Sequence, residues 1–339
     1  MACPMPAKQV TSGPPPRTGN PWPSLRQSPG AEHALNNLSD WLVADLEYVK
    51  CNICQRDETE VFLRDSSSVR FVKCRHDGLL YMNPRPRVES VRQFHTQFVR
   101  QDNLAFFSEY RREILGREAA AVKAFKSHGN LLDVGCATGT FFENFRPPDW
   151  RAFGVDTSSL GSSLARDMHK ASVFCGTVRQ ANYSSLFFDV ISMLDTLYYS
   201  PDPYAEILEF KRILKDDGLL AIEIPGYAYS LLRDKGPICW ILDRTWMRGF
   251  TKTRHLYYFS PRSLPLLLQR AGFRIVKVIP EQASLGKRGI ARVLNEMHLA
   301  LARAVFAITN GMLSIAGKEL YLAVKASAFP SATPNQCSI

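Results

Sequence analysis

The sequence contains no uninterrupted run of about 20 apolar residues, which is the length that a membrane-spanning helix needs. Its most apolar long stretch, residues 290–313, is interrupted by four ionisable side chains: Arg292, Glu296, His298 and Arg303. Prolines break up the first 38 residues, so the apolar core of a secretory signal is missing as well. These absences predict a protein of the cytoplasm.

Dense clusters of basic and aromatic residues are also missing, although the 339 residues carry a formal net charge of +10. A clustered basic face would bind phosphates, anionic lipid or nucleic acid. Scattered surface lysines and arginines explain the charge more simply, so no stable nucleic-acid partner is expected. A hydrophobic share of 45% at this length predicts one large buried core with room for a smaller second domain.

The most informative segment is residues 131–140, an apolar strand that runs through Asp133 into a glycine-containing turn. Gly135 and Gly139 allow backbone to approach a ligand closely, and a helix beginning after the turn would offer unpaired N–H groups. A second apolar strand, residues 151–156, ends in Asp156 after one helix's worth of chain. The pattern is typical of a doubly wound α/β sheet that binds a nucleotide-like cofactor, with the second acid on the ribose.

The spacing of the glycines distinguishes between cofactors. A dinucleotide fingerprint starting at Gly135 would require glycine at positions 137 and 140, where Ala137 and Thr140 stand. Asp133, inside the strand, is better suited to organising the loop or meeting a positively charged ligand than to meeting a pyrophosphate. S-adenosylmethionine, which carries an ammonium and a sulfonium, is such a ligand. Asp156 has a simpler alternative role as the cap of a helix that begins near residue 158.

From about Phe107 to Val324 the chain resembles the class I S-adenosylmethionine-dependent methyltransferases. The resemblance is carried by the segments already described and by residues 187–194, 201–203, 208–220, 255–261 and 271–273. It implies a Rossmann-like methyltransferase fold with a seven-stranded sheet whose last strand, residues 319–324, runs antiparallel. We expect that strand at the edge of the sheet.

The resemblance also implies which residues hold the cofactor. The loop around the methionine and ribose would contain Asp133, Gly135, Ala137 and Gly139. The ribose hydroxyls would be bound by Asp156, the adenine lined by Thr177 and Val178, and the end of the fourth strand marked by Leu194. Two departures stand out, because Ala137 replaces the usual middle glycine and residues 195–199 replace a stretch that often contains histidine. Thr177, Leu194 and Asp195 fit packing or capping roles equally well.

Methyl transfer is an in-line displacement, so the protein mainly aligns the reactants and excludes water. A base is needed only when the acceptor loses a proton. His255 is the first candidate, since histidine has a near-neutral reference pKa and this residue follows the expected lid at residues 227–254. A structural role, bonding the lid or capping the helix after Ser260, explains it equally well. Tyr257 and Asp195 are the reserve candidates.

Eight cysteines are present, and three of them crowd a short N-terminal segment. Cys51-x-x-Cys54 followed by Cys74 resembles the zinc ribbon that precedes many bacterial methyltransferases of this class, including those similar to the ubiquinone-biosynthesis O-methyltransferases. A fourth cysteine would stand where Asp77 stands, and zinc requires four ligands. Three alternatives remain: Asp77 as the fourth ligand, the adjacent His76 in its place, or a ribbon without metal.

The expected layout is a flexible proline-rich tail at 1–38, the ribbon at 39–86, a methyltransferase domain at 87–327 and a second tail at 328–339. A helical segment at 88–126 would cover the cofactor, as in the family. Residues 290–313 are expected to form an amphipathic helix that docks on the core or on a second subunit. Contact of that helix with a membrane, and hence a lipid-like acceptor, is the less favoured alternative.

The sequence therefore predicts a methyltransferase acting on a small molecule, with oxygen favoured as the acceptor atom and carbon or nitrogen left open. One alternative is an RNA or protein methyltransferase. Strongly salt-dependent RNA binding would favour this alternative. Another is a catalytically silent protein that kept the cofactor fold. The oligomeric state is not set by any pattern in the chain.

Overall fold

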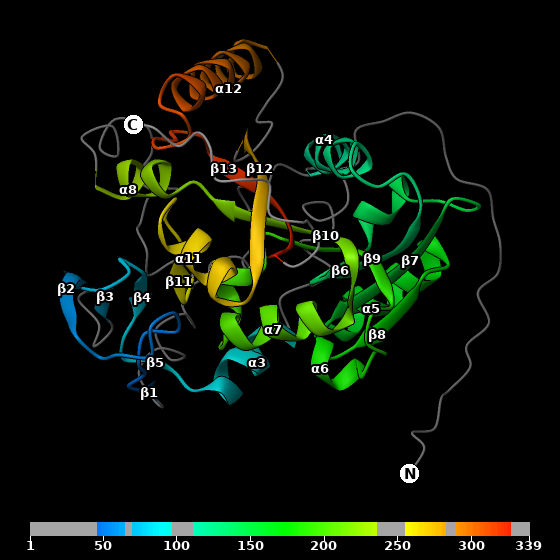
Figure 1. Ribbon diagram of the computed structural model, residues 1–339, viewed down its shortest axis with the longest axis horizontal. Helices are drawn as coiled ribbons and strands as arrows, with labels where there is room; N and C mark the ends of the chain where they lie inside the picture. Colours follow the sequence, from blue (N-terminus) through cyan, green and yellow to red (C-terminus); the bar gives the residue numbers. More distant parts are fainter. Residues whose placement is uncertain (1–45, 65–69, 97–110, 236–254, 283–288, 327–339) are drawn as a thin grey trace, which may run out of the picture. The chain divides into compact units, whose positions relative to one another are not determined.

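A seven-stranded sheet forms the centre of the structure, a computed structural model, with the strand order β12-β13-β10-β9-β6-β7-β8 (Figure 1). The structure describes five ranges of the chain: residues 46–64, 70–96, 111–235, 255–282 and 289–326. The predicted tails and residues 236–254 of the predicted lid lie outside them. The strands are β6 (Gly129–Val134), β7 (Trp150–Asp156), β8 (Ser172–Cys175), β9 (Phe188–Leu194), β10 (Leu214–Pro225), β12 (Phe273–Glu281) and β13 (Lys318–Lys325).

Neighbouring strands of this sheet are parallel except where β13 pairs with β10 and β12. This confirms the predicted doubly wound α/β fold with an antiparallel last strand. The predicted edge position is wrong, because β13 lies between β10 and β12. All eight residues of β13 are buried, whereas β12 has exposed and half-buried positions, so β12 takes the edge. A strand without alternating polarity is stable only when both its faces are covered.

Successive residues of the strands pack on opposite faces of the sheet, which produces a core on each side. Leu131 packs in one cluster and Leu132 in the other, and Val190 and Ile191 divide in the same way. This alternation follows from the period of two in a strand. Helices therefore have to cover both faces.

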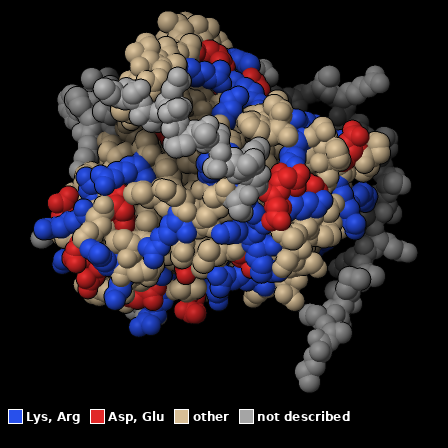
Figure 2. Space-filling model, in the orientation of Figure 1, with Lys and Arg blue, Asp and Glu red and all other residues tan. Residues whose placement is uncertain are grey.

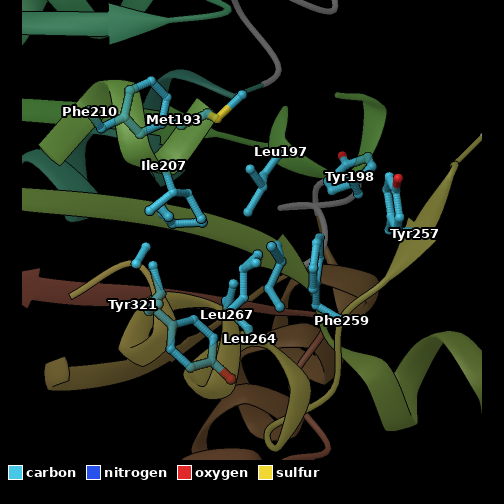
Figure 3. Close-up of a cluster of buried hydrophobic side chains, with 14 of the residues drawn as sticks. Met193, Leu197, Tyr198, Ile207, Phe210, Tyr257, Phe259, Leu264, Leu267 and Tyr321 are labelled. Atoms are coloured by element: carbon cyan, nitrogen blue, oxygen red, sulfur yellow. The ribbon is translucent and has the colours of Figure 1, made fainter. Parts of the chain in front are cut away.

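Helices cover both cores through residues spaced at helical intervals. On α4, the residues Leu115, Ala119 and Val122 face one core. On α7, Ile207 and Phe210 face the other, together with side chains from β9, α11 and β13 (Figure 3). The helices are α3 (Val88–Thr96), α4 (Arg112–Lys123), α5 (Ser159–His169), α6 (Val178–Ala181), α7 (Pro203–Ile213), α8 (Tyr227–Lys235), α11 (Ser263–Arg270) and α12 (Ile290–Ile308).

The connection from β6 to β7 differs from the prediction, because a short 3-10 helix, η3 (Thr140–Asn144), replaces the expected α-helix. Phe141 packs in the core beside α4, while the adjacent Phe142 packs in a separate cluster against Ala165 of α5. These two consecutive phenylalanine side chains therefore pack in different hydrophobic clusters. Two prolines follow at residues 147–148 and prevent continuation as a helix.

The N-terminal segment forms a small four-stranded sheet with the order β11-β4-β3-β2. Its strands are β2 (Thr59–Arg64), β3 (Arg70–Cys74), β4 (Leu80–Met82) and β11 (Tyr257–Tyr258), and a separate pair joins β1 (Leu46–Glu47) to β5 (Arg85–Pro86). Because β11 comes from far along the chain, this sheet is continuous with the methyltransferase part. The described residues accordingly form one compact unit.

The long helix α12 packs on β12 through its inner side, where Leu299 and Ala302 are buried. Arg292 on α12 also pairs with Glu113 of α4. The helix ends at Ile308, five residues before the predicted end at residue 313. Within the described ranges, no helix combines the length and apolar character needed to cross a bilayer.

Candidate cofactor and acceptor site

A cavity of about 500 Å³ opens at the carboxyl ends of β6, β7, β8 and β9. Parallel strands bring their carboxyl ends to one edge, which is where doubly wound folds bind ligands. On the side away from the strands, α3 and α7 contribute Arg92, His95 and Glu206 to the wall. Seven residues predicted from the sequence line the cavity: Gly135, Ala137, Asp156, Thr177, Val178, Leu194 and Asp195.

The loop after β6 borders the cavity with Gly135 and Ala137. Gly135 has φ +77°, and a Cβ there would lie 2.4 Å from the hydroxyl oxygen of Thr196, so a side chain cannot be accommodated. Ala137 has φ +46°, in the left-handed region that costs an L-residue about 1 kcal/mol. The loss of loop freedom expected for alanine at this position is therefore visible as backbone strain.

Asp156 fixes this loop and the start of α5 at the same time. One carboxylate oxygen accepts a hydrogen bond from the Ala137 amide at 2.8 Å, and the other accepts from the Ser158 amide at 2.7 Å. Burial raises the pKa of Asp156, while these amides act in the opposite sense. The helix-cap role belongs to Ser158, whose hydroxyl accepts from the Gly161 amide. Asp156 itself borders the cavity, as a ribose-binding acid would.

Two predicted cofactor residues lie behind the cavity wall. Asp133 is buried, and its carboxylate accepts a 2.7 Å hydrogen bond from the Ser192 hydroxyl on β9. Burial raises the pKa of Asp133 to about 7. Gly139 precedes η3 with φ +78°, and a Cβ there would lie 2.8 Å from the ring of Phe142. Both residues shape the loop from beneath and do not line the cavity.

Asp195 occupies the end of β9 in a left-handed conformation, with φ +58°. Lys318 donates to one of its oxygens at 2.6 Å, and the Tyr198 hydroxyl donates to the other. Glu223 of β10 lies 2.9 Å from the same lysine and 2.6 Å from the guanidinium of Arg111, which is also 3.4 Å from Asp195. Two cations and two carboxylates therefore form a balanced network at the cavity wall.

The network makes Asp195 a weak base. Burial alone would raise the pKa of Asp195, but Lys318 and Arg111 more than offset that effect and hold it well below its usual range. A third acid, Glu118 of α4, is buried beside the network, and burial together with Glu223 raises its pKa well above the usual value. The ionised form of Glu118 is therefore disfavoured.

The other two predicted catalytic residues do not line the cavity. His255 is buried behind Tyr198 and Tyr199, with ring centroids 4.1 and 5.2 Å away, and these tyrosines form the cavity wall. The Tyr257 hydroxyl donates to the carbonyl of Pro201 and accepts a hydrogen bond from Arg85. Burial raises the pKa of Tyr257 far above its usual range.

Sequence reasoning missed several residues that do border the cavity, among them Arg111, Tyr199 and Glu206. Glu206 lies in the first turn of α7, where an acid is expected simply for the helix dipole. Its Oε2 is enclosed and has no hydrogen-bond partner among the described residues, and burial raises its pKa to about 7. No local pattern distinguishes it from a surface glutamate.

A second cluster lies in the N-terminal sheet, where Cys51, Cys54, Cys74 and Asp77 place their sulfur and oxygen atoms within 4.8 Å of one another. The Cys54 and Cys74 sulfurs are 3.5 Å apart, and the Cys51 sulfur is 3.1 Å from Asp77. The second oxygen of Asp77 accepts from the Leu79 amide at 2.9 Å, which orients the carboxylate. His76 instead pairs with Glu58 and Arg56 on the surface.

A family model described as a methyltransferase domain matches residues 106–278. The match covers more than half of the 339 residues, and the chain therefore belongs to this family. With the strand order and the cavity described above, the chain is an S-adenosylmethionine-dependent methyltransferase of class I. No curated protein matches it in a sequence comparison.

Several solved structures are similar. A SAM-dependent methyltransferase from Archaeoglobus fulgidus is 20% identical, with 65% of this chain and 98% of that chain covered at a TM-score of 0.45. One from Aquifex aeolicus is 14% identical, with 67% and 99% covered at 0.44. A chain of the Haloferax volcanii complex between the Trm112 methyltransferase activator and its methyltransferase is 16% identical, with 67% and 99% covered at 0.46. These similarities carry no information about the acceptor of this chain.

Proposed function

We propose that the protein transfers a methyl group from S-adenosylmethionine to an oxygen atom of a small molecule. The observation that supports this most is the cavity at the strand ends, which continues to a wall formed by α3, α7 and two tyrosines. Its volume of about 500 Å³ lies within the range of small-molecule sites. A closer likeness to the ubiquinone-biosynthesis O-methyltransferases, and a location in the cytoplasm, remain predictions.

The cofactor would lie with its ribose at Asp156 and its adenine against Thr177 and Val178. Its methyl group would then point toward the end of β9, beside Leu194 and Tyr199. The bound cofactor supplies a methyl carbon activated by positive sulfur. The chain's own contribution is alignment and exclusion of water, which the buried loop after β6 and the aromatic wall provide.

We propose Glu206 as the residue that takes the acceptor's proton. The oxygen of the acceptor would form the new bond to the methyl carbon, its proton would pass to the Glu206 carboxylate, and the carbon–sulfur bond would break to leave neutral sulfur. Unlike Asp195, Glu206 has a pKa raised to about 7, so it is a strong enough base near neutral pH. His255 would then act as a positioning residue through Tyr198 and Tyr199.

Glu206→Gln should lower kcat/KM about 100-fold, the usual contribution of a general base, while the affinity for S-adenosylmethionine stays within twofold. Burial favours the neutral acid, and the base is active only when ionised, so wild-type kcat/KM should rise with pH through about 7. The variant should lose this rise. Glu209→Gln is the matched control, because Glu209 lies on the same helix and pairs with Arg212 outside the cavity. An unchanged pH profile in Glu206→Gln would exclude Glu206 as the base.

The acceptor class is tested by incubating the protein with methyl-labelled cofactor and fractions of a cell extract. We expect the label in a small organic molecule, with the new methyl group on oxygen. Label recovered in RNA or protein would replace the proposal with a macromolecular acceptor. Cofactor binding without transfer to any fraction would favour a silent cofactor-binding protein.

We also propose that Cys51, Cys54, Cys74 and Asp77 bind one zinc ion. Ligand atoms on a tetrahedral zinc lie about 3 to 4 Å apart, and the observed separations of 3.1 and 3.5 Å fit this spacing. The cluster is also largely buried, and Asp77 is held in orientation by a backbone amide, as metal-binding carboxylates usually are. The zinc would join β3 to the loop at residues 51–54 and have a structural role.

Metal analysis of the purified protein should find about one zinc per chain. Asp77→Ala should lower this content severalfold and reduce thermal stability, whereas His76→Ala should leave both unchanged because His76 faces Glu58 on the surface. A zinc content near zero in the wild type, with a melting temperature that chelator does not change, would contradict the proposed zinc site. Retained zinc in Asp77→Ala with loss in His76→Ala would transfer the fourth ligand to the histidine.

A further inference from the structure

The outward face of α12 is an apolar stripe that no described residue covers. Ile290, Leu294, Met297, Leu301 and Ile308 are 79, 58, 62, 57 and 81% exposed, and Ala304 between the last two is exposed as well. We call these six residues the α12 seam. In Figure 2 the upper end of the molecule, where Figure 1 places α12, is mostly free of Lys, Arg, Asp and Glu. An exposed patch of this extent usually marks an interaction site.

The spacing within the seam indicates what kind of surface it contacts. Its residues follow one another at intervals of four, three, four, three and four. These intervals average 3.6 residues, and their alternation of four and three is that of a heptad repeat, the pattern of a helix that pairs with another helix. The core-facing side of α12 is already formed by Leu299 and Ala302, which are buried. The helix therefore has two apolar sides, one for its own core and one for a partner helix.

We propose that the α12 seam packs antiparallel against the α12 seam of a second copy of this chain, which makes the protein a homodimer. The intervals read the same in both directions, so a two-fold axis on the seam side of the helix, at the level of residue 299, matches the seam to itself. Ile290 then lies opposite Ile308 of the partner subunit, and Met297 opposite the partner's Leu301. The large Leu294 meets the small Ala304 of the partner subunit, which suits interlocking of the two helices.

The charges on α12 favour a second copy of the chain as its partner and disfavour a membrane surface. An interfacial helix flanks its apolar face with cations that attract anionic lipid. The charged residues of α12 are instead mixed in sign, and Arg292 and Arg303 already contact Glu113 and Glu281 of their own chain. Glu296 likewise lies 3.7 Å from Arg117 of α4 in its own chain, so these charges of α12 are paired within the subunit.

Sedimentation velocity of the full chain tests the proposal. The wild type should sediment as a dimer at micromolar concentration, and the double variant Leu294→Glu with Leu301→Glu as a folded monomer, as judged by circular dichroism. Met168→Glu is the matched control, because Met168 on α5 is 56% exposed and lies outside the α12 seam, so this variant should remain dimeric. A monomeric wild type that floats with phosphatidylserine vesicles would overturn the proposal in favour of a membrane. A dimer that persists in the double variant would place the interface elsewhere.

Cysteine crosslinking tests the orientation without depending on a destabilising charge. A mixture of the single variants Met297→Cys and Leu301→Cys should form a disulfide-linked dimer under mild oxidation, above the level of the wild type with its native cysteines. Ile290→Cys alone should not, because its counterpart across the axis is Ile308. Crosslinking of Ile290→Cys with itself, without crosslinking in the mixture, would contradict the antiparallel arrangement.

Discussion

Asp156→Asn is expected to weaken S-adenosylmethionine binding about 30-fold, or about 2 kcal/mol. Both oxygens of Asp156 accept backbone hydrogen bonds, from Ala137 and Ser158. The amide group of asparagine replaces one acceptor by a donor, so one of these N–H groups would face another N–H group. The loop after β6 and the start of α5 would then separate at the proposed ribose site. Isothermal titration calorimetry measures the change directly.

Asp167→Asn provides the matched control for this variant. Asp167 lies on the exposed side of α5, and its only hydrogen bond among the described residues is a 3.5 Å contact from the Ser163 hydroxyl. The same chemical change should leave cofactor affinity within twofold. If Asp156→Asn bound the cofactor as tightly as the control, the two carboxylate oxygens would not be organising the cofactor site.

Lys318→Met is expected to lower the free energy of unfolding by about 3 to 5 kcal/mol. Lys318 is 6% exposed and contacts Asp195 and Glu223 at 2.6 and 2.9 Å. Its removal leaves two buried carboxylates against the single cation Arg111. A melting temperature about 10 °C lower would follow for a domain of this size. Chemical denaturation and calorimetry measure both quantities.

The loss of folding stability in Lys318→Met should become smaller as the pH falls. Lys318 and Arg111 hold the pKa of Asp195 below its unfolded value, so this carboxylate contributes stability that is present above about pH 4 and lost as the pH falls further. The difference between wild type and variant should therefore shrink in acid. A difference that grew as the pH fell would contradict the assignment of charges in the network.

Lys126→Met tests whether the loss of stability depends on burial or only on the removal of an ion pair. Lys126 lies 2.6 Å from Asp217, the same separation as between Lys318 and Asp195, but Asp217 is 77% exposed. Exposed pairs contribute at most about 1 kcal/mol because water screens both partners. A loss in Lys126→Met as large as in Lys318→Met would mean that burial does not set the energy of the network.

The fold and the cofactor edge were predictable because their signals are local. An apolar strand ending in a glycine turn, followed by a second strand ending in Asp156, occupies fewer than thirty consecutive residues. The later strands β9 and β10 contain short apolar runs that end next to Asp195 and Gly226. The confirmed α/β sheet follows from these runs and from the rule that parallel strands end at the same edge.

The network at Asp195 could not be predicted, because its members come from distant parts of the chain. Asp195 and Lys318 are 123 residues apart, and Lys318 begins a strand that is buried on both faces. A lysine at the start of a strand is usually exposed, so the sequence gives no reason to pair it. The interior position of β13 decides both its own burial and that of Lys318.

The roles of the catalytic candidates were also hard to predict, because they depend on contacts between separate elements. His255 is near the predicted lid in the chain, but the direction of its side chain depends on Tyr198 and Tyr199, which fill the space between it and the cavity. Glu206 reaches the cavity because α7 begins beside α6, a contact between separate elements. Proximity along the chain predicts the region in which a residue lies, but it does not predict the direction in which its side chain points.

The central claim is that the edge formed by β6, β7, β8 and β9 binds S-adenosylmethionine. Calorimetric titration of the full chain with S-adenosylmethionine tests it most directly. One molecule should bind per chain with a dissociation constant in the micromolar range, and the affinity should fall in Asp156→Asn but not in Asp167→Asn. Absence of heat at millimolar ligand, for both this cofactor and its demethylated product, would contradict the account.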